Sequence, residues 1–199
     1  MQTENTNKYL NVINWFGIVG GILTIIVIIA SVYNPWWQLV VGDGIMKINA
    51  SPMNTNFGLF GTHFVIPLIY ALNISSILTF ACSGTIMLVY SLATTKPYAK
   101  ELLKFSWKKP IYSVITNITC LTMIIILTNI ITGIKIPLIG ATTTTLPTQY
   151  TGNANIIVNL TSAFQWPFYL AIATAMLCIL AKIYHDKKIA PTIQTKTQQ

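Results

Sequence analysis

Four long apolar runs divide this chain, and they constrain its possible folds more than any other feature. They cover about residues 12–33, 64–92, 111–133 and 166–184. A helix of about 20 residues crosses roughly 30 Å of hydrocarbon, so each run is long enough to span a membrane. Hydrophobic residues make up 53% of the chain and charged residues only 8%, whereas a soluble domain carries about 25% charged residues. The sequence therefore predicts one integral membrane domain over residues 1–199, with four transmembrane helices in the lipid bilayer.

The first run is predicted to be a retained helix rather than a cleaved signal peptide. A signal peptide would have a shorter apolar region, of about 7–15 residues, that follows a basic segment. Trp15 lies near the start of the run, and Trp36 and Trp37 follow its end. Because tryptophan is enriched at membrane surfaces, we expect these three residues to anchor the two ends of the first helix.

The distribution of lysine predicts the orientation of the chain. All 12 basic residues are lysine; nine belong to the termini and the 93–109 linker, and Lys182 lies on the same side, near the end of the fourth run. Only Lys47 and Lys135 belong to the loops at 34–63 and 134–165. By the positive-inside rule, both termini and the linker are cytoplasmic and the two loops are external, in a multi-pass plasma membrane protein. The basic linker would also attract anionic lipid headgroups, although orientation explains its lysines equally well. The absence of arginine argues against a nucleic-acid partner, despite the net charge of +8.

Both predicted external loops contain strand-like segments. Residues 37–41 and 45–50 favour strands and are joined by Gly42, Asp43 and Gly44, which predicts a hairpin. Residues 155–161 resemble another strand, and a lone hairpin is marginally stable in water. We therefore expect an all-α membrane fold: a four-transmembrane-helix bundle with a small extracellular β-sheet of about three to five strands, formed from the two external loops.

Each of these loops also carries a glycosylation sequon. Asn49 and Asn159 begin the Asn-X-Ser/Thr patterns, and an external position would make both of them possible glycosylation sites.

Small and weakly polar residues recur at helical spacing within the apolar runs. Such residues let helices approach closely, and an amide in hydrocarbon needs a partner, so we expect Asn73, Asn117 and Asn129 to face the bundle interior. Three buried thiols, Cys82, Cys120 and Cys178, are expected to pack as apolar side chains. The predicted helix-packing residues are Gly17, Gly21, Ser75, Thr79, Ser83, Asn117, Ala171 and Ala175.

The titratable residues do not form a recognisable catalytic or metal-binding pattern. The two histidines, His63 and His185, are expected at helix ends on opposite membrane faces, so they could not share one metal ion. Paired carboxylates, zinc-type cysteine spacing and phosphate-binding glycine motifs are missing from the sequence. We therefore expect no enzymatic activity and no cofactor. The four acidic residues, which form no such pair in the sequence, are Glu4, Asp43, Glu101 and Asp186.

This arrangement resembles the claudin/PMP22-like family of four-helix membrane proteins, whose first external loop carries a Trp and, roughly twenty residues later, a Gly-Leu-Trp motif. Here Trp36 and Trp37 follow the first helix, and Gly58, Leu59 and Phe60 follow at a similar distance. The first loop is shorter than in that family and lacks the two cysteines that usually follow the motif, which puts the pore and partner-docking segments of claudins in doubt.

The resemblance implies a non-enzymatic structural protein, with an adhesion or membrane-assembly role through lateral and external-loop contacts with itself or with other membrane proteins. One alternative is an accessory subunit of a larger membrane complex of respiratory or oxygenase type. A second alternative is a small transporter or pore in which Asn73, Asn117 and Asn129 line a polar path.

Overall fold

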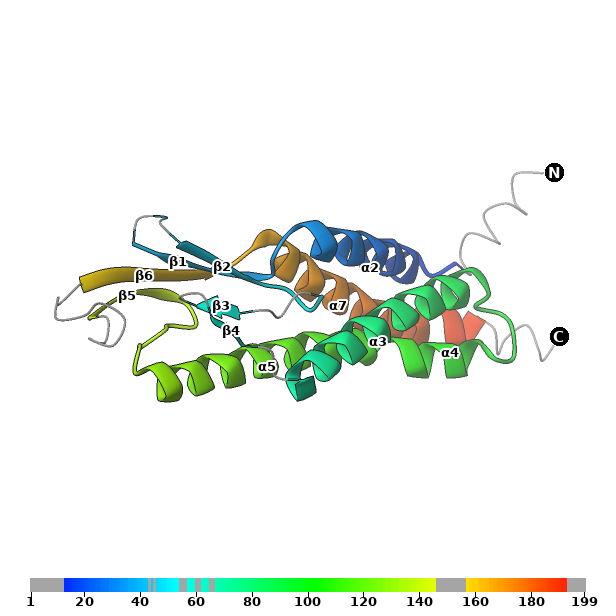
Figure 1. Cartoon of the computed structure of the whole chain (residues 1–199). Coiled ribbons are helices and arrows are strands. Elements are labelled where there is room, and N and C mark those ends of the chain that lie inside the picture. The colour runs from blue at the N-terminus through cyan, green and yellow to red at the C-terminus, as the bar shows by residue number, and fades with distance from the viewer. Residues whose placement is uncertain are drawn as a thin grey trace. The chain divides into compact units, whose positions relative to one another are not determined.

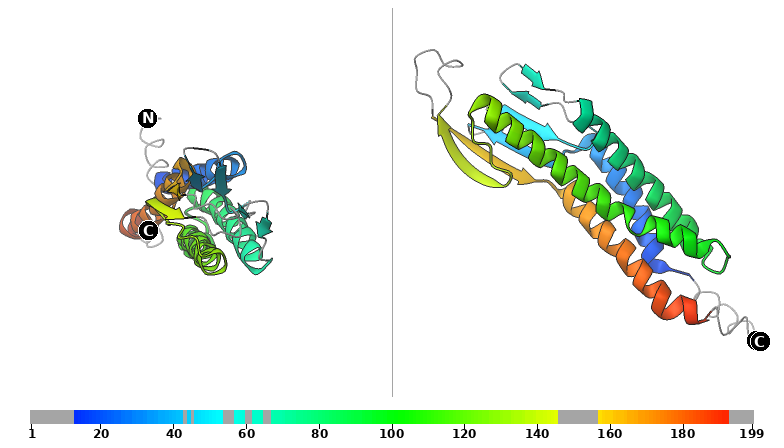
Figure 2. Two further views of the ribbon diagram at one scale, coloured as in Figure 1. Left: turned by 60° about the vertical axis from the view of Figure 1, so that its left-hand side comes forward. Right: turned by 90° about the horizontal axis from the view of Figure 1, so that it is seen from below.

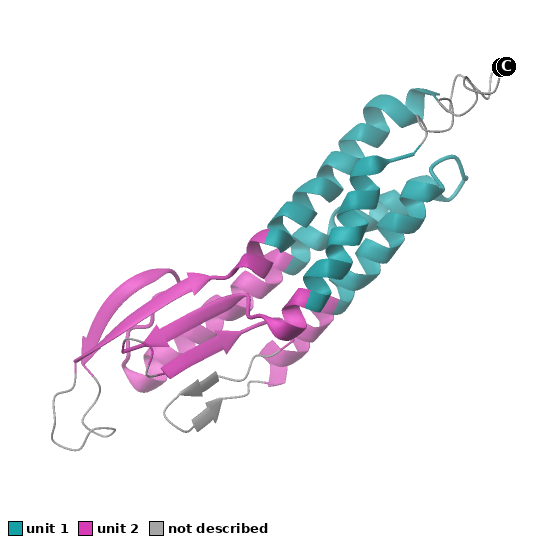
Figure 3. Ribbon diagram, turned by 90° about the horizontal axis from the view of Figure 1, so that it is seen from above, with its two compact units in different colours: residues 1–29, 78–113, 170–199 teal, residues 30–77, 114–169 magenta. Residues whose placement is uncertain are grey.

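The computed structural model describes residues 13–42, 44, 46–53, 57–59, 62–64, 67–145 and 157–192. They form four long apolar helices and a small antiparallel sheet (Figure 1). The chain divides into two compact units: residues 1–29, 78–113 and 170–199 form unit 1, and residues 30–77 and 114–169 form unit 2 (Figure 3). Each long helix contributes residues to both units, so the expectation of a single domain stays a prediction.

The long helices are α2 (Trp15–Tyr33), α3 (Pro67–Leu92), α5 (Lys109–Thr132) and α7 (Trp166–Tyr184). All four are long and apolar enough to cross a membrane, and their bounds lie within about three residues of the predicted runs. Proline stands in the first turn of three of them, where a missing N–H costs little. Gly133 ends α5 with φ at 69°, the left-handed conformation that commonly ends helices.

Unit 1 contains a short helix that the sequence analysis described only as a linker. This helix, α4, covers Ala99–Ser106 and buries Ala99, Leu103 and Ser106. Its buried residues are spaced by three and four positions, so they share one face. Leu103 packs in a core cluster with Tyr90 and Cys178. After α7, the chain continues as the π-helical turn η1 (His185–Ile189).

Unit 2 contains a four-stranded sheet that joins the two predicted loops. Its strands are β1 (Trp37–Val41), β2 (Met46–Ala50), β5 (Gly140–Thr145) and β6 (Ile157–Phe164), in the order β2-β1-β6-β5. Every neighbouring pair is antiparallel, and β1 from the first loop pairs directly with β6 from the second. The prediction that strands from both loops form one sheet is therefore confirmed.

Three local details of this sheet go beyond the expectation. Gly42 and Gly44 adopt φ values of 53° and 97° at the turn between β1 and β2, a region that favours glycine. The threonine run 142–145 belongs to β5, and β6 extends to Phe164 rather than ending near residue 161. Figure 2 shows β5 and β6 as a curved pair of strands.

A second, two-stranded sheet consists of β3 (Phe57–Leu59) and β4 (Thr62–Phe64). Gly58 and Leu59 of the motif lie on β3, and Gly58 is paired with His63. Phe60 lies outside the described residues.

The core of unit 2 lies between one face of the four-stranded sheet and helix α5. Trp37, Leu39 and Val41 alternate along β1 and point to this core, and Leu160 joins them from β6. Burial of a large apolar side chain stabilises a fold by about 1.5–3 kcal/mol, so this layer holds the sheet in place. The partners on α5 are Cys120, Leu121, Ile124 and Ile125.

Candidate functional site

The surface of the four-stranded sheet opposite the core is the first candidate site, and we call it the outer sheet face. Successive strand residues point to opposite faces, so the positions between the core residues gather here. Lys47, opposite Val40, carries the one charge among the described residues of this face, which is otherwise rich in threonine and asparagine. Its described residues are Gln38, Val40, Lys47, Asn49, Ala141, Thr143, Thr145, Ile157, Asn159, Thr161 and Ala163.

Both sequon asparagines lie exposed on the outer sheet face. Asn49 is opposite Gln38, whose Nε2 donates a hydrogen bond to Asn49 Oδ1 at 2.9 Å. Asn159 is opposite Thr143 in the β5–β6 pair. The sheet therefore presents both side chains on one surface, while their glycosylation stays a prediction.

Trp36 and Trp37 do not serve as anchors at a lipid surface, contrary to our expectation. Their exposed fractions are 2% and 0%, and both indole N–H groups donate hydrogen bonds within unit 2. Trp36 bonds to Ser31 Oγ at 2.7 Å, and Trp37 bonds to the carbonyl of Leu138 at 2.7 Å. They are core residues that fix the start of β1, and the exposed aromatic residue at the end of α2 is Tyr33.

Gly17 and Gly21 lie where α2 approaches α3 in unit 1. A Cβ atom at Gly17 would overlap Ser91, and one at Gly21 would overlap Leu88. The matching residue on α3 was not predicted from the sequence: a Cβ at Gly84 would overlap Thr24 of α2. Gly84 lacks a second glycine four residues away, so the pattern used for α2 could not find it.

The predicted stripe of Ser75, Thr79 and Ser83 is not a single packing face. Ser83 is fully buried, Thr79 is half-buried and Ser75 is exposed. The hydroxyls of Ser75 and Ser83 donate to carbonyls of their own helix, at Leu72 and Phe80. A helix has 3.6 residues per turn, so a strict four-residue repeat drifts by about 40° at each step. Over two steps, this drift carries the stripe from the exposed side into the core.

The predicted packing residues on α7 are both buried. Ala171 and Ala175 are 0% and 7% exposed, and Cys178 continues their face toward Gly20 of α2, where a Cβ would meet its Sγ at 3.3 Å. Cys120 is buried as well, but Cys82 is exposed, so the expectation of three buried thiols is wrong for Cys82.

Asn117 and Asn73 form the polar contact that the sequence predicted for the interior. They are 6% and 2% exposed, and Asn117 Nδ2 donates to Asn73 Oδ1 at 3.4 Å. The adjacent cavity measures about 10 Å³, which holds about one water molecule. Asn129 has a different role, because its side-chain oxygen accepts a hydrogen bond from Ile136 N at 2.9 Å and so orders the chain after α5.

A buried polar cluster lies near the end of α7 in unit 1. Asn14 Nδ2 donates to the carbonyl of Ala181 at 2.7 Å and to the Tyr90 hydroxyl at 3.1 Å. The Tyr90 hydroxyl lies 2.7 Å from His185 Nδ1. Each of these buried groups has a partner, as buried polar groups require, so the cluster is a satisfied network that fixes His185.

Metal chemistry has no obvious location in the described part of the chain. Within it, no group of three or more His, Cys, Asp or Glu side chains is placed to hold a metal ion.

A shallow pocket of about 340 Å³ follows α2, where Ser31, Tyr33, Asn49 and Ser51 are among its lining residues. Ser31 and Ser51 are buried and already hydrogen-bonded within unit 2, since Ser31 Oγ accepts from Trp36 and Ser51 Oγ donates to the Ser31 carbonyl at 2.8 Å. The exposed members of this set are Tyr33 and Asn49.

Comparisons with known proteins do not assign the chain to a family: no family model, no curated protein and no solved structure matches it.

Proposed function

We propose that this chain is a non-enzymatic multi-pass membrane protein of claudin-like type, which acts through contacts with copies of itself or with other membrane proteins. In this proposal the four long helices cross the plasma membrane, the termini and the α3–α5 connection are cytoplasmic, and the outer sheet face is external. The observation that carries the proposal is the pairing of β1 with β6, which joins the two loops into one sheet.

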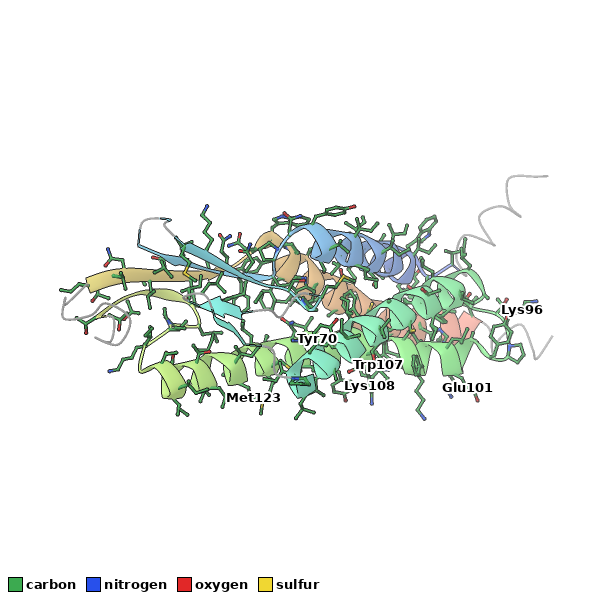
Figure 4. The ribbon with its side chains drawn as sticks, viewed as in Figure 1. Tyr70, Lys96, Glu101, Trp107, Lys108 and Met123 are labelled. Atoms are coloured by element: carbon green, nitrogen blue, oxygen red, sulfur yellow. The ribbon has the colours of Figure 1, made fainter. Side chains whose placement is uncertain are left out.

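The exposed surfaces of the helices support the membrane part of the proposal. Met123 of α5 points away from the protein (Figure 4) and is 52% exposed, and Tyr70 of α3 is 44% exposed. Ile130 on α5 is 74% exposed and Leu68 on α3 is 70% exposed. Large exposed apolar surfaces of this kind need lipid or another protein to cover them.

The composition of the outer sheet face supports a role in contact rather than chemistry. Threonine, asparagine and glutamine dominate it, and these side chains form hydrogen bonds without the cost of desolvating a charge. The claudin resemblance supports the same role through the shared topology and Gly58 and Leu59. A pore through Asn117 gains little support, because the cavity beside it has room for about one water molecule.

Site-specific photo-cross-linking in native membranes tests the proposed contacts. A photo-reactive residue at Thr161, on the outer sheet face, is compared with one at Thr95, an exposed threonine in the turn after α3. We expect a ladder of self-multimers at Thr161, and much weaker adducts at Thr95.

The pattern of the adducts separates the candidate functions. A single heterologous band of fixed size would favour the accessory-subunit alternative over self-association. The absence of adducts at Thr161, together with ion flux in reconstituted vesicles that Asn117→Leu abolishes, would overturn the proposal in favour of a pore.

A further inference from the structure

A pocket of about 400 Å³ lies at the lysine-rich end of unit 1. One side is the turn between α3 and α4, with Thr94 and Lys96, together with Lys100 at the start of α4. The other side is the start of η1, with His185 and Asp186. Figure 4 shows Lys96 in this turn. The volume falls in the range of about 300–1,000 Å³ that is typical of small-ligand sites.

The charges around this pocket favour an anion. Lys96 and Lys100 both line it, whereas Glu101 does not. Asp186 is the acidic lining residue, but Lys182 Nζ lies 2.6 Å from both of its carboxylate oxygens. This is the one ion pair among the described residues, so the charge of Asp186 is already balanced and the two lining lysines make the pocket positive.

The pocket also contains a fixed hydrogen-bonding group. His185 is buried, and its Nδ1 is held by the Tyr90 hydroxyl at 2.7 Å. Asn14 donates to the Tyr90 oxygen. In the tautomer in which the Tyr90 hydroxyl donates to Nδ1, the neutral imidazole carries its proton on Nε2. An imidazole N–H beside two ammonium groups is a donor set suited to phosphate oxygens.

The surroundings of the pocket distinguish a lipid from a soluble anion. Helix α4 buries one face and exposes Lys100 and Lys104 on the other. Tyr98 and Phe105 are 48% and 45% exposed beside these lysines, and Leu92, just before the turn, is 71% exposed. Exposed aromatic and apolar side chains next to lysines are typical of a helix that lies in the headgroup region of a membrane.

We propose that this pocket binds the phosphate headgroup of an anionic phospholipid, with Lys96, Lys100 and His185 around the phosphate. The inference rests on the membrane placement in the proposed function. Lipid binding would then fix the position of α4 and of the end of α7 at the membrane surface.

Binding of a short-chain phosphatidylglycerol to the purified full-length chain in neutral detergent tests this site. The test variant is Lys96→Gln with Lys100→Gln, and the matched control is Lys187→Gln with Lys188→Gln. The control pair removes the same charge from exposed lysines of η1 that do not line the pocket. We expect the pocket variant to bind about 25-fold more weakly, since each lysine contributes about fivefold, and the control to bind nearly as well as the wild type.

Two further ligands identify the source of the anion. Phosphatidylcholine of equal chain length should bind at least tenfold more weakly than phosphatidylglycerol, and inorganic phosphate should compete poorly. Equal losses in the two double variants, or equal binding of the two lipids, would overturn the proposal. Inorganic phosphate binding as tightly as the anionic lipid would also overturn it, in favour of a soluble anion. The lipid-binding measurement uses isolated protein in micelles. A negative result would therefore reject the lipid site but would not change the cross-linking result at Thr161, which tests the proposed function.

Discussion

At the scale of single residues, the packing of α2 against α3 depends on Gly84 as well as on Gly17 and Gly21 of α2. A Cβ at Gly84 would overlap the Cβ of Thr24. That atom is fixed to the backbone of α2, so rotation of the side chain cannot move it away. At Gly17 the obstructing atom is the Ser91 hydroxyl, which can rotate. The tolerance to substitution should therefore differ between these positions.

We expect Gly84→Ala to lower the free energy of unfolding by about 1–3 kcal/mol, the usual cost of overpacking. Gly20→Ala is the matched control, because Gly20 is also helical and an added Cβ would meet Cys178 Sγ at 3.3 Å and Leu177 Cβ at 3.5 Å. Since alanine has about 1 kcal/mol better helix propensity than glycine, the control should be neutral or slightly stabilising. Reversible unfolding in mixed detergent micelles measures both, and equal stabilities of the two variants would contradict the close approach at Gly84.

At the scale of elements, the pairing of β1 with β6 determines whether the two loops form one structure. Gln38 is directly opposite Ala163, whereas Thr161 is opposite Val40. Directly opposite residues in antiparallel strands have Cα atoms about 4.5–5.5 Å apart, within the range that a disulfide spans. Diagonal neighbours are about 7–8 Å apart.

The register predicts which cysteine pairs can form a disulfide. With Cys82 replaced by serine, Gln38→Cys with Ala163→Cys should form an intramolecular disulfide under mild oxidation. Gln38→Cys with Thr161→Cys should not. Mass spectrometry of the unreduced peptides measures both pairs. A preference for the second pair would show a register shifted by two residues, and the absence of both bridges would contradict the sheet.

The elements with strong apolar or alternating patterns could be predicted from sequence, and those that depend on tertiary contacts could not. The four helices and β1 followed from run length and strand propensity. The strand β5 was missed because Thr142–Thr145 has no apolar alternation, and its pairing with β6 decides its conformation. Helix α4 was missed because it is short and three of its eight residues are charged, namely two lysines and a glutamate, and it therefore looked like part of a linker.

The candidate site residues divide in the same way, into those that a sequence pattern reveals and those that depend on tertiary contacts. Gly17, Gly21 and Asn117 were found because small and amide residues in an apolar run have few other roles. Trp36 and Trp37 were assigned to the membrane surface because the sequence does not reveal the buried partners Ser31 and Leu138. The pocket at the lysine-rich end of unit 1 could not be predicted, because its lining residues are far apart in the sequence. It brings residues 94–100 together with His185 and Asp186.

At the scale of the whole molecule, the central proposal is that the loops at 34–63 and 134–165 are external and the 93–109 linker is cytoplasmic. The distribution of the 12 lysines and the length of the four apolar helices support it. Glycosylation at Asn49 and Asn159 would agree with it, because both side chains are exposed on the outer sheet face.

Cysteine labelling from outside intact cells tests this claim most directly. In a chain with Cys82 replaced by serine, one variant carries Thr143→Cys on β5 and another carries Thr95→Cys in the α3–α4 turn, both at exposed positions. A membrane-impermeant maleimide should label the Thr143→Cys variant in intact cells, and the Thr95→Cys variant only after permeabilisation. Labelling of both variants in intact cells, or of the Thr95→Cys variant alone, would contradict the account.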